Sequence, residues 1–501
     1  MTQTIAWLKA ICVNRSAKVP HFYVTEELMK AFRRIFLQRA RQRLLSRTAV
    51  GLICTLFLTE APAAGIQNER KNDLKPASVN STGRFVSSSG KPRLIAPKSI
   101  TIGESPGIHA ADLTPGNVYQ IVAEMRDVIG RNWRSSADFR AGANGVIDLE
   151  DDPPIQGSYN GRDMFGLLWS MKMLPQPDGS KPLDPPLDYN EITYQLSANK
   201  QLVSSTSTKQ WIIPPGLKSE RTADGIIGEI FSTADSSGSR PGILLLGGSG
   251  GGMNWARRQA ALLANEGYVA MALAYFNAEG LEKHLAQIPL EYVDKALNIL
   301  INHRGTDRKR IAIMGYSKGA ELALLMGSRR NDVSTIVAYA PASAVFQGFK
   351  PPKYPVISSW SFGGEDWPFV PNAYDKQFFE TNDGMYLWYR TLKQYDKMEA
   401  AAIPIEKVSG RIMLISGAKD TIWPSTLMGE QMVGRLRILG LKAKLTHLVF
   451  GDAGHGIAAP PGEPLTRVAK SLGGTPHGNA TARREGWRQI KEFLSKELGK
   501  T

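Results

Sequence analysis

The sequence predicts two domains, a smaller all-β sandwich followed by an α/β domain built on a doubly wound, mostly parallel sheet. Short alternating runs separated by turn residues fill the chain from about residue 93 to 202, a pattern typical of sandwiches. From about residue 225, apolar strands alternate with helical segments, which indicates a parallel sheet covered by helices on both faces. The length of 501 residues allows two or three domains, and 42% hydrophobic with 21% charged residues excludes global disorder.

The formal net charge of +15 is unevenly distributed along the chain. The first 63 residues hold ten Lys or Arg and only three Asp or Glu, so nearly half of the excess lies there. The remaining chain is only modestly basic, and we therefore expect no nucleic acid partner. The mean hydropathy is −0.22 and no apolar run reaches 18 residues, which excludes a polytopic membrane protein.

Residues 1–63 are predicted to be an export signal that leads to the periplasm or to secretion. Arginines precede the apolar stretch Thr48–Leu58, and Ala61-Pro-Ala63 forms an A-x-A cleavage site. This stretch is too short to cross a bilayer, so the mature chain is expected to lack a membrane span. Met29 is an alternative start, and Arg33-Arg34 resembles a twin-arginine motif. The alternative is a basic amphipathic helix, with the protein remaining in the cytoplasm.

Residues 64–90 are rich in Asn, Lys, Ser and Gly without apolar periodicity, and are predicted to be a linker. Residues 91–205 contain alternating runs such as 117–123 and 191–196 between turn sequences, and we expect them to form an immunoglobulin-like sandwich. Residues 206–500 are predicted to be the catalytic domain.

Each element expected in residues 206–500 rests on an apolar run or a helical period. Strands are expected at 227–232, 242–246, 268–274, 310–314, 335–339, 411–415 and 446–450, and helices at 254–265, 290–303, 320–327, 424–439 and 482–498. Aromatic residues interrupt this alternation at 341–400, which we expect to form a cap whose Trp360 and Phe362 contact an alkyl chain. The alternative is that these aromatics are ordinary core.

The pattern G-x-S-x-G occurs three times, around Ser105, Ser249 and Ser317. A nucleophilic serine of this type needs a strand before it and a helix after it, because the sharp turn between them exposes the hydroxyl. Ser105 is followed by a proline in β-like sequence, and Ser249 lies among small residues in Gly247–Gly252. Only Ser317 follows a predicted strand and precedes a predicted helix.

A base and an acid complete the expected catalytic group. His455 lies in the loop just after the last predicted strand, and His477 is the reserve candidate. Asp420 follows the strand 411–415 and lies between Ser317 and His455, whereas its rival Asp452 is too near His455 in sequence. The order Ser, Asp, His is that of α/β-hydrolases.

The oxyanion of the tetrahedral intermediate needs backbone donors. We expect them to be the N–H of Lys318 and one N–H from the loop that holds Gly248, Ser249, Gly250 and Gly251. The loop lacks the dinucleotide fingerprint and the P-loop lysine. Cys12 and Cys54 both precede the cleavage site, which excludes thiolate metal sites from the mature chain, and no metal site is expected.

Several segments resemble the acyl-CoA thioesterase / bile acid-CoA:amino acid N-acyltransferase family. They are 133–139, 157–164, 242–252, 271–277, Gly315-Tyr-Ser-Lys-Gly-Ala-Glu321, 403–407 and Ala453-Gly-His455. The resemblance covers about residues 90–500. It implies a Ser317–Asp420–His455 triad that acts on acyl thioesters, and a serine nucleophile in this family goes with hydrolysis.

Three functions follow from these observations. The first is an acyl-CoA thioester hydrolase that releases fatty acid and coenzyme A through an acyl-enzyme, with no cofactor beyond the substrate's own coenzyme A. The second is an acyltransferase to an amine, or an exported carboxylesterase, using the same triad. The third is a non-catalytic binding protein, which the complete triad disfavours.

Overall fold

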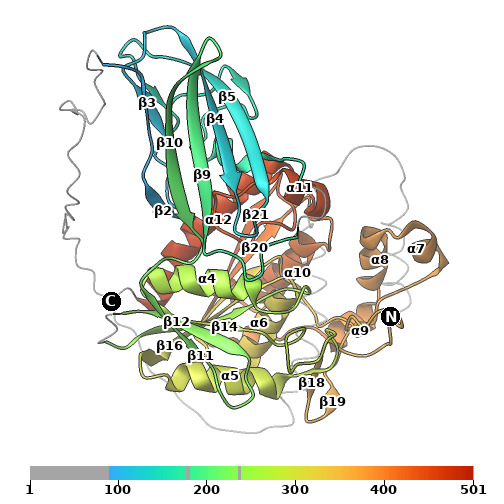
Figure 1. Cartoon of the computed structure of the whole chain (residues 1–501). Coiled ribbons are helices and arrows are strands. Elements are labelled where there is room, and N and C mark those ends of the chain that lie inside the picture. Colours follow the sequence, from blue (N-terminus) through green and yellow to red (C-terminus); the bar gives the residue numbers. More distant parts are fainter. Residues whose placement is uncertain (1–89, 177–180, 235–237, 500–501) are drawn as a thin grey trace. The chain divides into compact units, whose positions relative to one another are not determined.

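The computed structural model of this chain describes residues 90–176, 181–234 and 238–499 (Figure 1). All of them belong to one compact unit, Asp73–Thr501. The predicted export signal at 1–63, and the predicted linker apart from its last residue, lie outside the described residues. Within the described ranges, no helix has the length and apolar character that are needed to cross a bilayer.

The N-terminal part of the described chain consists mainly of two sheets. One sheet has the order β1-β3-β6, from Arg93–Ile95, His109–Ala111 and Ile147–Asp148. The other has the order β2-β10-β9-β4-β5-β7, from Ser99–Thr101, Gln201–Trp211, Tyr189–Ala198, Val118–Arg126, Asn132–Arg140 and Gln156–Gly157, and β8 (Lys172–Met173) pairs with β5. The short helix α3 (Gly166–Trp169) lies between β7 and β8 in sequence. The immunoglobulin-like topology stays a prediction. The expected boundary after residue 205 falls inside β10.

The C-terminal part is built on an eight-stranded sheet of order β11-β12-β14-β13-β16-β17-β20-β21. Its strands are Leu217–Arg221, Gly228–Thr233, Val269–Leu273, Arg240–Leu246, Thr306–Tyr316, Thr335–Tyr339, Arg411–Gly417 and Leu445–Phe450. The six strands from β14 to β21 pair in parallel, whereas β12 is antiparallel to both of its neighbours, β14 and β11. The predicted mostly parallel sheet is confirmed, with two antiparallel pairings at one edge.

Helices cover both faces of this sheet (Figure 1). Leu244 and Leu246 of β13 pack with α5 (Leu290–Asn302) and α6 (Lys318–Arg329). Ile243 and Leu245 point to the opposite face, in the core formed with α4 (Asn254–Asn265) and α12 (Pro476–Leu498). Because neighbouring residues of one strand lie in two separate cores, β13 is apolar throughout rather than alternating.

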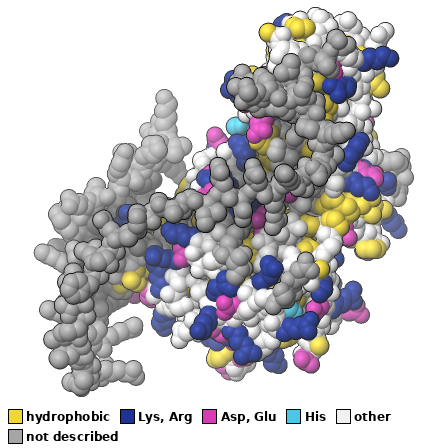
Figure 2. Space-filling view, turned by 90° about the vertical axis from the view of Figure 1, so that its left-hand side faces the viewer, with side chains coloured by type: hydrophobic (Ala, Val, Ile, Leu, Met, Phe, Trp, Pro, Cys, Tyr) yellow, Lys and Arg dark blue, Asp and Glu magenta, His cyan; other side chains and the backbone are white. Residues whose placement is uncertain are grey.

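The remaining elements lie mostly in segments that interrupt the alternation. They are β15 (Ile288–Pro289), β18 (Trp360–Phe362), β19 (Glu365–Asp366), α7 (Lys376–Thr381), α8 (Gly384–Thr391), α9 (Tyr395–Ala400), α10 (Ser425–Ile438), α11 (Thr466–Leu472) and the 3₁₀ turns Ile405–Lys407 and Lys442–Lys444. On the face that Figure 2 shows, Lys and Arg are interspersed with Asp and Glu rather than gathered into one basic patch.

The N-terminal part contacts the C-terminal part at α11 and α12. The N–H of Leu465 donates to the Trp169 carbonyl over 2.9 Å, and the Thr466 hydroxyl donates to the Met171 carbonyl over 2.8 Å. Asp163 is buried and accepts hydrogen bonds from the Trp169 indole at 3.0 Å and from Arg484 of α12 at 2.9 Å. One buried carboxylate therefore links the two parts of the chain.

We predict that Asp163→Ala lowers the free energy of unfolding by about 3 kcal/mol, because it leaves a buried indole N–H and a half-buried arginine without their partner. The matched control is Glu124→Ala, which breaks the exposed Arg134–Glu124 pair and should cost less than about 1 kcal/mol. Urea unfolding of both variants measures the two losses. Equal small losses would contradict the structural role of Asp163.

Candidate active site

Ser317 lies in a sharp turn between β16 and α6. Its backbone has φ +56° and ψ −121°, a left-handed conformation that is strained for a residue other than glycine. The Ser317 N–H donates to the Tyr339 carbonyl of β17 over 2.9 Å, which fixes the turn to the sheet. A Cβ at Gly319 would overlap the carbonyl oxygens of Leu246 and Gly247. The second glycine of this G-x-S-x-G motif is therefore required by close backbone packing.

Asp420 and His455 form a buried hydrogen bond of 2.8 Å between Oδ2 and Nδ1. Asp420 follows β20 and His455 follows β21, two neighbouring parallel strands. The same carboxylate accepts hydrogen bonds from the Ser425 hydroxyl at 2.7 Å and from the N–H of Ile422 at 2.9 Å. Because an ionised carboxylate only accepts, Nδ1 carries the proton in this arrangement and Nε2 is left as the basic nitrogen.

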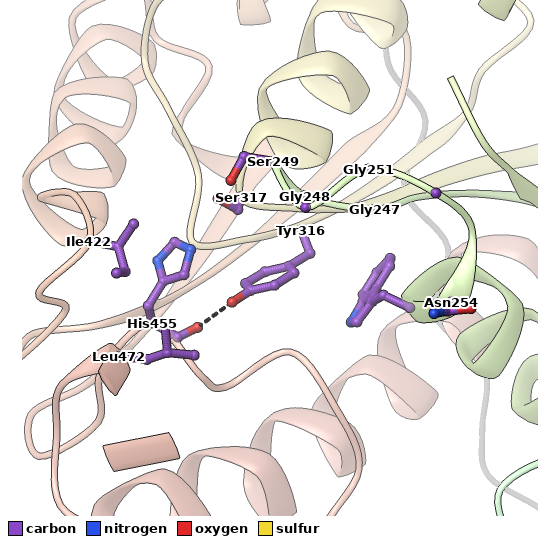
Figure 3. Close-up of a pocket in the computed structure, with 13 residues that line it drawn as sticks. Gly247, Gly248, Ser249, Gly251, Asn254, Tyr316, Ser317, Ile422, His455 and Leu472 are labelled. Carbon is purple, nitrogen blue, oxygen red and sulfur yellow. Dashed lines mark hydrogen bonds between the residues drawn. The ribbon is translucent and has the colours of Figure 1, made fainter. Parts of the chain in front are cut away.

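Ser317 and His455 line one pocket of about 390 Å³ (Figure 3). Its floor is the glycine-rich loop 247–252, and its walls include Trp255, Tyr316, Ile422 and Leu472. The Trp255 indole donates to the Ala458 carbonyl over 2.6 Å and packs on the Tyr316 ring at 5.8 Å. The site therefore combines a strained serine, an oriented imidazole and a mostly apolar wall.

The predicted oxyanion donors lie beside Ser317. Lys318 is the first residue of α6, where backbone N–H groups have no partner within the helix. Gly248, Ser249, Gly250 and Gly251 all line the pocket. A Cβ placed at Gly248 would lie 3.2 Å from the Ser317 Cβ, so this part of the loop is next to Ser317. The arrangement suits an acyl transfer reaction.

Two family models match the chain in the order expected for one family. "Acyl-CoA thioester hydrolase/BAAT N-terminal region" matches residues 104–223, and "BAAT / Acyl-CoA thioester hydrolase C terminal" matches residues 288–500. The chain belongs to this acyl-CoA thioester hydrolase/BAAT family.

Relatives from mammals match over most of the chain. The chain is 28% identical to acyl-coenzyme A amino acid N-acyltransferase 2 of Mus musculus, over 81% of this chain and 98% of the relative. It is also 28% identical to bile acid-CoA:amino acid N-acyltransferase of Mus musculus, over 80% and 96%, and to mitochondrial acyl-coenzyme A thioesterase 2 of Homo sapiens, over 77% and 80%. The family thus includes proteins named for transfer and proteins named for thioester hydrolysis.

Three of the alternatives to the predicted triad residues lie outside the pocket. His477, the reserve base, is in α12 and packs edge-on against Trp169 at 5.7 Å. Asp452, the rival acid, pairs with Lys419 at the surface. Ser105 is exposed and accepts a hydrogen bond from the Gly107 N–H. Of the three, none lines the pocket.

The predicted contact of Trp360 and Phe362 with an alkyl chain is wrong. Neither side chain lines the pocket, and no residue of 341–400 does. Trp360 is fully buried in the core beneath α6, where its indole donates to Glu321 over 2.8 Å. Phe362 is exposed and packs against the Arg329 guanidinium, 4.1 Å from its ring centroid. The pocket walls come instead from residues near Trp255, Ile422 and Leu472.

The structure contains a second group of a serine, a histidine and an acid, which was not predicted from the sequence. His447 Nε2 lies 2.8 Å from the Ser416 hydroxyl, and Nδ1 lies 2.9 Å from the Glu430 carboxylate. Ser416 is fully buried within β20 and does not line the pocket. The register of β20 and β21 pairs Ser416 with Val449 and His447 with Leu414, so no simple pairing rule predicts this contact. Its role is structural because substrate cannot reach the hydroxyl.

Burial lowers the pKa of His447 below its ordinary value of 6.5, despite the opposing effect of Glu430. The unfolded chain therefore takes up a proton more readily than the folded chain once the pH falls below about 6.5. We predict that the free energy of unfolding falls between pH 7.5 and pH 5.5, and that His447→Gln removes part of this fall. Urea unfolding at the two pH values measures the difference, and an unchanged pH dependence in His447→Gln would contradict it.

Proposed function

We propose that this protein hydrolyses acyl-CoA thioesters to a free fatty acid and coenzyme A. Ser317 is the nucleophile, His455 is the general base and acid, and Asp420 orients the imidazole. The observation that carries this proposal is the Asp420–His455 hydrogen bond beside a pocket that both His455 and the strained Ser317 line. Membership of a family whose relatives are named for thioester hydrolysis and acyl transfer supports acyl-CoA as the substrate class.

The reaction proceeds in two halves. Ser317 Oγ attacks the thioester carbonyl carbon while His455 Nε2 takes the hydroxyl proton. The tetrahedral intermediate then collapses, the C–S bond breaks, and the imidazolium returns the proton to the thiolate. Water attacks the resulting acyl-Ser317 ester with the same base, and the fatty acid leaves as the serine regains its proton. The chemistry uses no group beyond the protein, the acyl-CoA and water.

The negative charge on the former carbonyl oxygen is expected to be stabilised by two backbone donors. One is the N–H of Lys318 at the start of α6, where the helix dipole adds a partial positive charge. The other comes from the loop residues Gly248 to Gly251. Each such donor is typically worth about 3 kcal/mol in the transition state.

Transfer to an amine is the second candidate function, because relatives of the chain are named amino acid N-acyltransferases. The first half-reaction is the same, and an amine replaces water in the second. A carboxylesterase with the same triad would take an oxygen ester instead, which is the form expected outside the cell if the predicted export signal is used. Both alternatives share Ser317 and differ only in substrate and acceptor.

We predict that Ser317→Ala abolishes turnover while the fold is kept, because a small residue in the turn supports little packing. The purified chain is assayed with acyl-CoAs and oxygen esters, with and without amino acid acceptors, and a fluorophosphonate probe is mapped by mass spectrometry. The expected result is free acid from acyl-CoA and label on Ser317. Acyl-amine as the main product would favour transfer, and free acid from oxygen esters alone would favour a carboxylesterase.

Ser105→Ala is the matched control, because it changes an exposed serine of the same G-x-S-x-G pattern outside the pocket. It should keep full activity and full labelling of Ser317. Label on Ser249 in the unmodified protein would overturn the assignment of the nucleophile.

The apolar wall predicts a preference for alkyl chains, since each buried methylene contributes up to about 0.8 kcal/mol, or about fourfold in kcat/KM. We predict that Trp255→Ala moves the optimum of kcat/KM to longer acyl chains, because the indole closes the wall beside Tyr316. A series of saturated acyl-CoAs measures the profile. Phe362→Ala is the control and should leave the profile unchanged, because Phe362 lies outside the pocket. An equal loss at all lengths in Trp255→Ala would contradict the wall's role.

A further inference from the structure

Tyr275 is a buried tyrosine behind the glycine-rich loop. It lies just after β14, and its hydroxyl donates to the Gly247 carbonyl over 2.6 Å. Burial, with the nearby Glu321, raises the pKa of Tyr275 above its ordinary value, so the phenol stays a donor at any physiological pH. Nothing in the proposed reaction uses this side chain directly, and it does not line the pocket.

The hydrogen bond fixes the orientation of one peptide group. The cis peptides in the described residues precede Pro185 and Pro352, so the Gly247–Gly248 bond is trans. In a trans peptide the carbonyl and the following N–H point in opposite directions. With the Gly247 carbonyl held toward Tyr275 in the core, the Gly248 N–H is directed to the other side, and Gly248 lies in the pocket wall beside Ser317.

Two donors farther along the loop are already used. The Gly251 N–H donates to the Gly248 carbonyl over 3.2 Å, and the Gly252 N–H donates to the Phe276 carbonyl over 2.9 Å. In the described part of the chain, the Gly248 N–H has no protein acceptor. It is therefore available to a negatively charged oxygen formed at Ser317.

Tyr275 is in turn held by the helix that carries the nucleophile. Its ring packs on Trp360 with 5.7 Å between centroids, and the Trp360 indole donates to Glu321 over 2.8 Å. Glu321 is fully buried in the first turn of α6 and pairs with Lys318 Nζ at 2.6 Å. Tyr275 thus connects the start of α6 with the loop on the other side of the pocket.

We propose that Tyr275 is a positioning residue that orients the Gly248 N–H as the second oxyanion donor, opposite the N–H of Lys318. This inference rests on the proposed Ser317 chemistry and assigns one donor among the four loop residues. Without the Tyr275 hydroxyl, the Gly247–Gly248 peptide group is free to rotate. In part of the molecules the Gly248 N–H then points away from the oxyanion and does not stabilise the transition state. The ground-state thioester, whose carbonyl carries less charge, is affected less.

The test is Tyr275→Phe, which removes only the hydroxyl and keeps the ring against Trp360. We expect kcat for acyl-CoA hydrolysis to fall about tenfold, less than the 10²–10³ typical of complete loss of a donor, while KM and Tm change by little. Binding of an acyl trifluoromethyl ketone, whose adduct carries an oxyanion, should weaken by a similar factor. A purely structural role would lower Tm without this split between kcat and KM.

Tyr268→Phe is the matched control, because Tyr268 is also buried and its hydroxyl has no hydrogen-bond partner among the described residues. It should behave like the unmodified protein. The rate of fluorophosphonate labelling of Ser317 is measured as well, since it needs the oxyanion donors but no particular substrate.

Slower labelling in Tyr275→Phe supports the inference even if the protein does not hydrolyse acyl-CoA. That combination would overturn the proposed function alone. Unchanged kcat, ketone binding and labelling in Tyr275→Phe would overturn the inference and leave the proposed function standing. An equal loss in Tyr268→Phe would also overturn it.

Discussion

The close approach of two backbone segments determines the geometry of the whole site. At the end of β13 and at the start of α6, Leu246, Gly247 and Gly319 are packed so closely that a single methyl group would separate them. This contact presses the strained turn at Ser317 against the loop 247–252, and the hydrogen bond from the Ser317 N–H to β17 holds it from the other side. A serine with positive φ is costly, typically about 1–3 kcal/mol, and persists only where its surroundings fix it in this way.

The position of His455, the proposed base, depends on contacts from both parts of the chain. His455 lies at the start of a long segment between β21 and α12. Arg483 of α12 donates to the Gly456 carbonyl over 3.0 Å, and Leu465 and Thr466 bond to the N-terminal part through Trp169 and Met171. This segment has little regular structure of its own. Those hydrogen bonds, rather than a helix or a strand, therefore hold it and the His455 imidazole in place. The N-terminal part therefore contributes to the position of His455, although it supplies no residue to the pocket wall.

The sequence predicted the elements that repeat a simple pattern and missed those that depend on tertiary contacts. Apolar runs such as 242–246 are recognisable because strands buried on both faces are apolar throughout. Ser317 could be chosen from its strand and helix alone. Trp360 and Phe362 were misplaced because an aromatic-rich segment looks the same whether it covers a pocket or fills a core. In the structure, the buried Glu321 gives the Trp360 indole a partner in that core, and no local pattern reveals such a pairing.

The two Ser–His–acid groups show why hydrogen-bond geometry alone does not define a catalytic site. Ser416 and His447 are as close as a nucleophile and its base need to be, and Glu430 completes the series. Yet Ser416 lies within β20, where ladder pairing with β21 uses the backbone donors that an oxyanion would need. Its hydroxyl also accepts a hydrogen bond from Thr426 and is closed to solvent. Ser317 differs in both respects, because a turn into a helix leaves free N–H groups beside the hydroxyl and opens it to a pocket. The backbone around the serine, more than its histidine, therefore marks Ser317 as the candidate nucleophile.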